Sequence, residues 1–334
     1  MPVKLLILCT VLLIFTASAC APIGAPEPEE TSVITTVTEA TAPPVEIYGL
    51  SFDVPPKKIV CLSPAITEIF YELYLNDRLV GVGEYCDYPP EALTEKVNCG
   101  SAANPDFDTI ISLAPDVLIT QSPIANKDIT RLKNAGITLL NIPAVTDVNG
   151  IGRLYTDIAL LCIGAVPEGM TGGGASIAMP GLDSFYEDMK TPDLTLGKFV
   201  YYLSDDFTAA GFDTFPGNFF RKFGLNICDG DSAVMLPEEI SPKAVILPAY
   251  LSHLADEYFT DSHSRVYILS EEATQFLERP TSRVRFVITE LAEDQKAAEL
   301  EERMESSEEG SDGVEGEDET DGADGEDGTD ETAE

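Results

Sequence analysis

Cys20 is the residue whose position points most directly to a covalent reaction, because small residues lead into it after an apolar run. Lys4 gives a positive start, residues 5–15 are almost entirely apolar, and Ala17-Ser18-Ala19 precede the cysteine. A run of this length is too short to span a bilayer and is typical of an export signal. We therefore expect either cleavage before Cys20 with acylation of its sulfur, as in exported lipoproteins, or simple secretion that leaves a free thiol.

The rest of the chain lacks the common patterns for catalysis and cofactor binding. It has no Gly-x-Ser-x-Gly, no Gly-x-x-x-x-Gly-Lys, no His-Glu-x-x-His and no dinucleotide-binding glycine pattern. The only histidines are His253 and His263, too few for a cluster of imidazole ligands. The sequence therefore predicts neither an enzyme, nor a cofactor, nor a metal site.

Five further cysteines follow Cys20, an odd number that cannot pair completely among themselves. Cys61, Cys162 and Cys228 lie in apolar runs, so we expect buried thiols there. Cys86 and Cys99 fall in expected loops, and their spacing alone does not show whether they form a disulfide.

The charge of the chain disfavours a nucleic-acid partner, since its formal net charge is −38 and phosphate binding requires lysine and arginine. Residues 301–334 hold 17 acidic residues and a single basic one, Arg303, and are expected to form an acidic disordered tail. The Pro-, Glu- and Thr-rich residues 20–46 are expected to form a disordered linker behind the signal peptide 1–19.

The core alternates between strand-like and helix-like segments, a pattern that favours parallel sheets with helices on their faces. Short apolar strands are expected at residues 58–62, 78–82, 117–120 and 137–142, with Ser63 capping a helix that begins at Pro64. The second half repeats the pattern, with strands at 198–203, 244–247 and 265–269. Between them, residues 148–190 have largely helical spacing, interrupted by Gly172-Gly173-Gly174.

Three stretches of the first half resemble the substrate-binding proteins of ABC importers for vitamin B12, ferric siderophores and haem. Residues 58–68, Lys-Ile-Val-Cys-Leu-Ser-Pro-Ala-Ile-Thr-Glu, resemble the opening of these proteins. Residues 81–92, Gly-Val-Gly-Glu-Tyr-Cys-Asp-Tyr-Pro-Pro-Glu-Ala, resemble the B12-type branch, and residues 104–119 match a third segment. The resemblance covers about 47–300 and is looser in the second half, where 210–215 and 265–267 match more weakly.

The resemblance implies the class III periplasmic-binding-protein fold: two Rossmann-like α/β lobes, 47–147 and 191–300, joined by a helical backbone connector, 148–190. It implies a monomer, exported and lipid-anchored to the outer face of the cytoplasmic membrane, that delivers its ligand to a permease and its ATPase. An acidic residue on each lobe would dock on that permease. The matching first-lobe position is Asp108, and its second-lobe counterpart is Glu238 or Glu239.

A cleft between two such lobes needs aromatic walls and a few polar groups. By matched position, Tyr85 is the first candidate, with Asp87 and Tyr88 beside it, although Tyr88 could instead pack on the following prolines. The strand ends of the second lobe supply four more candidates that are equally compatible with core or loop packing: Asp205, Phe207, Tyr250 and Phe276.

The ligand implied by the resemblance is a corrinoid or an iron chelate, but the chain has no tryptophan, an aromatic residue that B12 binders of the family usually present. An acidic chain with few arginines is a poor fit for a bare anionic siderophore, which requires cationic partners; Arg279 and Arg283 remain the candidates for that role. The alternatives are a receptor-like surface or sensory module that takes no ligand and, from another class, a hydrolytic enzyme.

Overall fold

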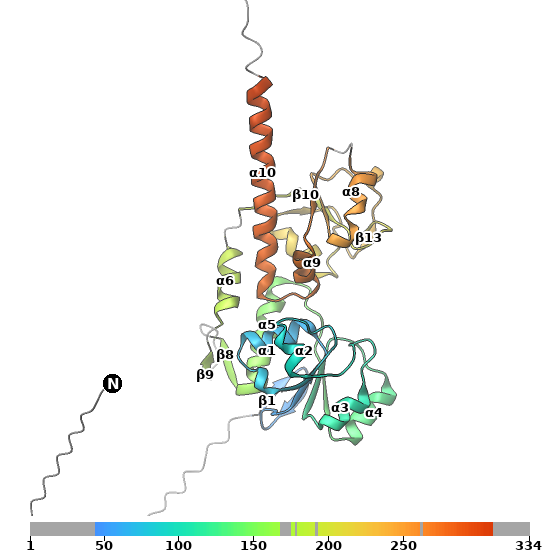
Figure 1. Ribbon diagram of the computed structural model, residues 1–334, viewed down its shortest axis with the longest axis vertical. Coiled ribbons are helices and arrows are strands. Elements are labelled where there is room, and N and C mark those ends of the chain that lie inside the picture. Colours follow the sequence, from blue (N-terminus) through green and yellow to red (C-terminus); the bar gives the residue numbers. More distant parts are fainter. Residues whose placement is uncertain (1–43, 168–174, 178, 191–192, 261–262, 310–334) are drawn as a thin grey trace, which may run out of the picture. The chain divides into compact units, whose positions relative to one another are not determined.

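The computed structural model describes residues 44–167, 175–177, 179–190, 193–260 and 263–309. The predicted signal peptide, Cys20, Gly172-Gly173-Gly174 and the tail after Glu309 lie outside these residues. Within them, the prediction of two α/β lobes is confirmed, and Figure 1 shows the first lobe in blue to green and the second in yellow to red.

The first lobe is built on a five-stranded sheet in the order β5-β4-β3-β6-β7, in which every neighbouring pair is parallel. The central strands are buried apolar runs, as expected for strands covered on both faces. The strand bounds are β3 Ile59–Cys61, β4 Leu79–Val82, β5 Val97–Asn98, β6 Val117–Thr120 and β7 Thr138–Asn141. An antiparallel hairpin of β1 (Val45–Ile47) and β2 (Leu50–Phe52) precedes them.

The helices of the first lobe follow its strands: α1 Pro64–Glu72, α2 Glu91–Glu95, α3 Phe107–Leu113 and α4 Asn126–Asn134. The predicted cap of α1 is confirmed, because the hydroxyl of Ser63 accepts a hydrogen bond from the Ile66 backbone N–H at 3.3 Å and Pro64 is the first helical residue. A 3-10 turn, Asn76–Arg78, leads into β4.

The second lobe repeats this plan with a four-stranded parallel sheet, ordered β12-β10-β14-β15. Its strands are β10 Gly197–Tyr201, β12 Gly224–Asn226, β14 Ala244–Leu247 and β15 Arg265–Ile268, beside the short antiparallel pair β11 Thr208–Ala209 and β13 Ala233–Val234. Its helices are α7 Phe215–Phe219, α8 His253–Tyr258 and α9 Glu271–Glu278, with 3-10 turns at Phe220–Lys222, Pro237–Glu239 and Ala249–Leu251.

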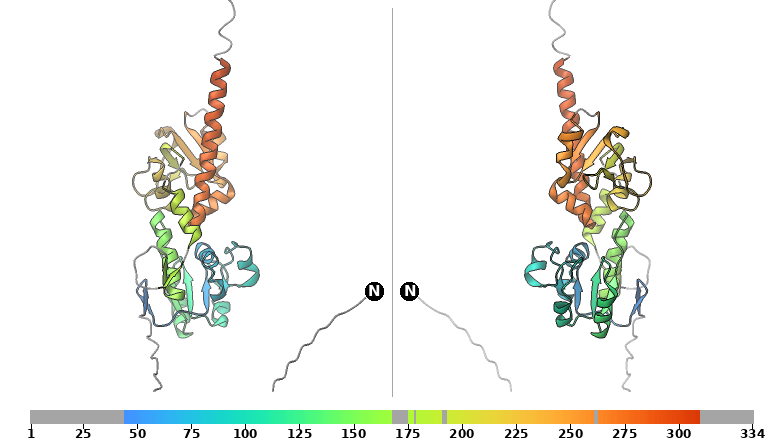
Figure 2. Two further views of the ribbon diagram at one scale, coloured as in Figure 1. Left: turned by 90° about the vertical axis from the view of Figure 1, so that its left-hand side faces the viewer. Right: turned by 90° about the vertical axis from the view of Figure 1, so that its right-hand side faces the viewer.

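The connector contains the helices α5 (Val148–Ile163) and α6 (Pro180–Asp188), and between them β8 (Ala165–Pro167) pairs in parallel with β9 (Ala175–Ile177). A 3-10 turn, Ser282–Val284, leads into the long helix α10, Arg285–Glu309 (Figures 1 and 2). One hydrophobic cluster includes residues of both lobes, α5, α6 and α10, so the lobes share a continuous core.

Two predicted boundaries are wrong. Strand β1 begins at Val45, inside the predicted linker, and α10 continues nine residues into the predicted disordered tail. Residues 297–302 are Ala, Leu and Glu, which favour helix, and Arg265 pairs with Glu302 at 2.7 Å.

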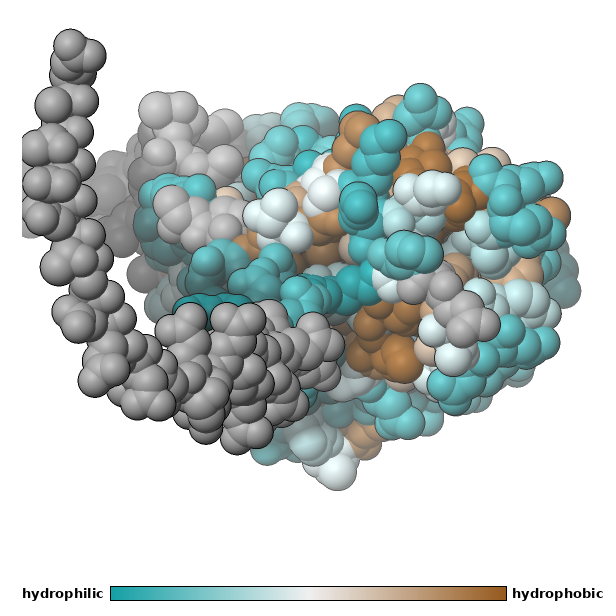
Figure 3. Space-filling view, turned by 90° about the horizontal axis from the view of Figure 1, so that it is seen from above, coloured by the Kyte–Doolittle hydropathy of each residue, from teal (hydrophilic) through white to brown (hydrophobic). Residues whose placement is uncertain are grey.

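On the face seen in Figure 3, groups of hydrophobic residues are separated by hydrophilic ones.

A buried ion pair joins the lobes. Both carboxylate oxygens of Glu68 in α1 bind the guanidinium of Arg283, and the Glu68 Oε2 to Arg283 Nη2 distance is 2.5 Å. The side chains of Glu68 and Arg283 are 2% and 15% exposed. The Thr281 hydroxyl donates a further hydrogen bond to Glu68 at 2.7 Å. Because the pair is bidentate and otherwise shielded from water, it fixes the angle at which residues 281–283 cross α1.

A second carboxylate of α1 extends this contact to the connector. Glu72 accepts hydrogen bonds from the Tyr155 hydroxyl at 2.5 Å and from the Ser282 hydroxyl at 3.0 Å. Burial raises the pKa of Glu72 above its ordinary value, and the two hydrogen bonds oppose that rise. We call the six residues of this contact the joint: Glu68, Glu72, Tyr155, Thr281, Ser282 and Arg283.

Replacing Glu68 by alanine should lower the free energy of unfolding by about 3–5 kcal/mol, because Arg283 would stay largely buried without its counter-charge. Urea unfolding followed by circular dichroism measures this loss.

The matched control is Glu187→Ala, which removes an exposed pair with Lys190 and should change the unfolding free energy by less than about 1 kcal/mol. Equal losses in the two variants would show that the Glu68–Arg283 pair does not hold the lobes.

Candidate ligand cleft

A cavity of about 420 Å³ lies between the lobes, and its walls come from both of them. This volume is within the range of small-molecule sites, roughly 300–1,000 Å³. The first lobe supplies Ser63, Pro64, Ala65, Gln121, Ala144, Val145 and Thr146. The second lobe supplies Tyr201, Leu203, Asp213, Thr214, Phe215, Pro216, Tyr250, Leu277, Glu278, Arg279 and Pro280.

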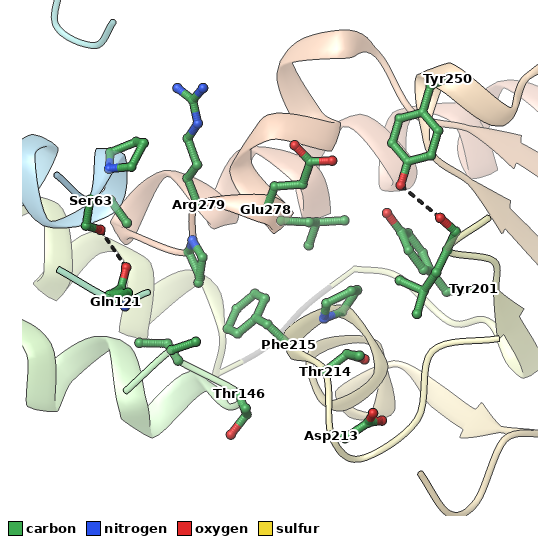
Figure 4. Close-up of a pocket in the computed structure, with 18 residues that line it drawn as sticks. Ser63, Gln121, Thr146, Tyr201, Asp213, Thr214, Phe215, Tyr250, Glu278 and Arg279 are labelled. Atoms are coloured by element: carbon green, nitrogen blue, oxygen red, sulfur yellow. Dashed lines mark hydrogen bonds between the residues drawn. The ribbon is translucent and has the colours of Figure 1, made fainter. Parts of the chain in front are cut away.

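The first-lobe wall is polar and held in place. Ser63 lies just beyond the end of β3 and Gln121 directly follows the neighbouring strand β6, so both occupy the carboxyl edge of the parallel sheet. Ligands of such sheets bind at this edge. The Ser63 hydroxyl donates to Gln121 Oε1 at 2.5 Å, and Gln121 Nε2 donates to the Pro143 carbonyl at 3.3 Å (Figure 4).

The second-lobe wall is aromatic. Tyr201 ends β10, and Phe215 begins α7, where the Thr214 hydroxyl caps the helix by accepting from the Gly217 backbone N–H at 3.2 Å. The hydroxyl of Tyr250 donates to the Leu203 carbonyl at 3.2 Å, which orients a ring that is 52% exposed. In Figure 4, Phe215 lies between the Thr146 side and the tyrosines, so an apolar surface faces a polar one.

Three charged residues complete the lining. Asp213 accepts hydrogen bonds from the backbone N–H and hydroxyl of Ser232, both at 2.7 Å, and these bonds lower the pKa of its carboxyl group. Burial raises the pKa of Glu278, and the neighbouring Arg279 opposes the rise. Arg279 itself pairs with Asp87 of the first lobe, and in Figure 4 its side chain runs away from Phe215.

Two contacts beside the cavity connect its opposite walls. The amide nitrogen of Asn218 in α7 donates to the Thr146 carbonyl at 2.8 Å, and Arg279 binds Asp87. Both link the second lobe to loops of the first. The lobes are therefore in direct contact next to the cavity at two points.

The three candidates from the first lobe lie outside the lining of this cavity. Tyr85 is 60% exposed, and Asp87 is occupied by Arg279. Tyr88 stacks on the guanidinium of Arg283, 3.5 Å from the ring centroid, and it lines a second cavity behind the joint. The segment therefore lies next to the cleft, but Asp87 and Tyr88 contact arginines of the second lobe instead of the cavity.

The second-lobe candidates divide into two groups. Tyr250 lines the cavity, and Asp205 lies on the surface, 3.1 Å from His253. Phe207 and Phe276 are absent from the lining of the cavity and pack in the core clusters, which corrects their expected place in the cleft. Aromatic residues near strand ends pack inward here because each lobe needs apolar cover for its own sheet.

The three acids expected to dock on a permease are all exposed. Asp108 begins α3 and pairs with Arg131 at 2.5 Å, yet its side chain is 91% exposed. Glu238 and Glu239 lie on the 3-10 turn Pro237–Glu239 of the second lobe.

Cys61, Cys86, Cys99, Cys162 and Cys228 are free and buried, so the possible disulfide between Cys86 and Cys99 is not formed. Burial raises the pKa of the Cys61 thiol to about 12, and the Thr67 hydroxyl lies 3.3 Å from the Cys86 sulfur. Burial also raises the pKa of Cys86, Cys99 and Cys162, and thiols with a raised pKa are poor nucleophiles, so these four side chains serve as packing.

Sequence reasoning missed several residues of the lining, chiefly Gln121, Thr214, Phe215 and Glu278. Gln121 follows the apolar strand 117–120, and Thr214 precedes Phe215-Pro216 as a helix cap does, so both were open to prediction. Glu278 ends an amphipathic helix and gives no sequence signal of its position in a cavity.

The described residues contain neither a membrane-spanning helix nor a metal-binding group. None of their helices has the length and apolar character needed to cross a membrane. Among the same residues, histidine, cysteine and carboxylate side chains form no group of three that suits a metal ion.

Part of this sequence, and the fold, are similar to those of known proteins. Residues 59–158 match the model of the family described as periplasmic binding protein. A cobalamin-binding protein of Halobacterium salinarum is 28% identical over 185 residues, which are 53% of this chain and 47% of that protein. An uncharacterised ABC transporter substrate-binding lipoprotein of Bacillus subtilis is 36% identical over 138 residues, 40% of each chain.

The solved structures that match cover more of the chain at lower identity. The periplasmic vitamin B12 binding protein of Vibrio cholerae has a TM-score of 0.56 at 22% identity, over 73% of this chain and 98% of that one. A periplasmic haem-binding protein from Roseiflexus has a TM-score of 0.51 at 18% identity, over 71% and 96%. These structures share the fold. By sequence, the chain spans less than half the length of the curated relatives described above.

Proposed function

We propose that this chain, whose residues 59–158 match the model of the periplasmic binding protein family and which has the class III fold, is an exported substrate-binding lipoprotein. It captures a corrinoid or an iron chelate between its lobes and delivers the ligand to the permease of an ABC importer. Its family consists of binding proteins rather than enzymes.

The observation that carries this proposal is the cavity at the facing edges of the two lobes. Its first-lobe wall presents the hydroxyl groups of Ser63 and Thr146 and the amide of Gln121. Its second-lobe wall presents the rings of Tyr201, Phe215 and Tyr250. A large ligand with one apolar surface and a polar rim matches such a pair of walls better than a bare ion does.

The relatives support the ligand class. Relatives named for a ligand include the cobalamin-binding protein of Halobacterium salinarum and a vitamin B12-binding protein of Vibrio cholerae that is 39% identical over 88 residues. Structures of the same fold carry haem in their names as well as vitamin B12. The proposal therefore includes corrinoids and iron chelates.

Replacing Tyr250 by alanine should weaken the binding of the ligand by about tenfold or more, because an exposed aromatic ring of the cavity wall would be lost. The probes are cyanocobalamin, haemin and ferrichrome, first tested for a rise in melting temperature and then by calorimetric titration.

Tyr258→Ala is the matched control, because Tyr258 is 46% exposed in the same lobe but does not line the cavity. The proposal requires that at least one probe binds the unmodified protein and that the Tyr250 variant is the weaker binder. Binding of none of the three probes would instead favour a surface module without a ligand.

We further propose that Asp108 and the Glu238–Glu239 pair dock on the permease. The carboxylates lie on different lobes and point into solvent, as contacts to arginines of a membrane partner require. Lysine at position 108 should reduce ligand uptake by proteoliposomes containing the cognate importer by about tenfold, since a favourable ion pair becomes a repulsive one.

The control for this reversal is Asp256→Lys, which makes the same charge change at an exposed position of α8. An equal loss of uptake in both variants would show that the change in net charge alone explains the effect and that Asp108 is not part of the docking surface.

Cys20 is proposed as the lipid attachment site that keeps the protein at the membrane. The Cys20→Ala variant should lose incorporation of labelled palmitate and move from the membrane to the soluble exported fraction, because no acyl chain can be attached. Cys9→Ala, which changes a cysteine inside the export signal, is the control and should keep the label. Retention of label by the Cys20 variant would exclude this site.

A further inference from the structure

Arg279 is the only cation among the described residues that line the cleft, and it already forms an ion pair with a carboxylate. Its guanidinium binds the carboxylate of Asp87, which lies outside the lining on the opposite lobe. The Arg279 side chain is 19% exposed and runs away from the cavity centre in Figure 4. The charge of Arg279 is therefore paired with Asp87 and is not available to a ligand in the cavity.

The remaining charges of the lining are negative. Asp213 is held by the two hydrogen bonds from Ser232, and Glu278 is exposed at the end of α9. Among the described residues Glu278 has an ion pair with neither lysine nor arginine at contact distance. With Arg279 paired to Asp87, the carboxylates of Asp213 and Glu278 are the unpaired formal charges of the described lining, an excess of negative charge that disfavours carboxylate-rich ligands and favours neutral or cationic ones.

The loop that carries Asp87 is fixed by contacts that do not involve Asp87. The Cys86 backbone N–H donates to the Gly83 carbonyl at 3.0 Å, and the Cys86 sulfur lies 3.3 Å from the Thr67 hydroxyl. On the other side, Tyr88 stacks on Arg283 of the joint. The loop thus presents the Asp87 carboxylate to Arg279 independently of the ion pair itself, and an amide at position 87 would keep the shape while releasing the cation.

We infer that Asp87 is the residue that sets the charge selectivity of the cleft: by holding Arg279, it makes the cleft accept neutral or cationic chelates and reject anionic ones. This inference rests on the proposed function, since it specifies which class of chelate that cleft takes. Asp87 acts through Arg279 and is a positioning residue without contact to the ligand. Specificity of this kind arises from an arrangement that penalises the wrong ligand.

The test compares a neutral and an anionic probe on the full exported chain. Cyanocobalamin is the neutral probe, and haemin, with two carboxylates, is the anionic one. In Asp87→Asn the ratio of haemin affinity to cyanocobalamin affinity should rise by about tenfold, because Arg279 becomes free to pair with a carboxylate. The rise should shrink as the salt concentration increases.

Two further variants separate this effect from a change in folding. Asp87→Asn/Arg279→Gln should lose the gain in the affinity ratio, and Glu187→Gln, an acid-to-amide change on the exposed pair with Lys190, should leave the ratio as it was. Melting temperatures of all three variants check that each protein is folded.

The outcomes are distinct. A raised ratio that depends on Arg279 supports the inference. An unchanged ratio in Asp87→Asn, with cyanocobalamin still bound, overturns the inference and leaves the proposed function standing. Tighter binding of haemin than of cyanocobalamin by the unmodified protein also overturns it. Binding of neither probe to any variant overturns the inference, and the proposed function fails as well only if ferrichrome also does not bind.

Discussion

The buried pair between Glu68 and Arg283 is the interaction on which the arrangement of the lobes depends. Burying a carboxylate and a guanidinium is unfavourable unless each satisfies the other, and the bidentate geometry with the Thr281 hydroxyl achieves this. The same helix, α1, begins at the cleft with Ser63 and Pro64 and ends at the joint with Glu72. A shift of Arg283 relative to α1 would therefore also change the separation of the cleft walls.

The fold was predictable where local patterns and burial agree. Ser63-Pro64 gives both a cap and a first helical residue, and the apolar run 244–247 can be buried only as a central strand. The end of α10 was not predictable in the same way, since charge alone suggested disorder from residue 301. Helix propensity and the tertiary contact of Arg265 with Glu302 outweigh the repulsion between the acids up to Glu309.

The cleft was predictable only in part, because its residues are defined by contacts across long stretches of sequence. Asp87 and Arg279 are 192 positions apart, and neither residue shows in its own neighbourhood that it is paired. Phe207 and Tyr250 look alike as aromatics after second-lobe strands, yet Phe207 is buried against Tyr202 and Tyr258 while Tyr250 faces the cavity. Only the three-dimensional packing of the second lobe distinguishes them.

The segment 84–90 connects the chemistry of the cleft with the mechanics of the lobes. Asp87 binds Arg279 at the cavity, and one residue later Tyr88 stacks on Arg283 in the joint. The two arginines lie four positions apart in the second lobe, so the segment contacts that lobe at two neighbouring points. A ligand that attracts Arg279 weakens the first of these contacts and leaves the second to hold the segment. One short loop therefore contacts both the arginine at the cleft and the arginine of the joint.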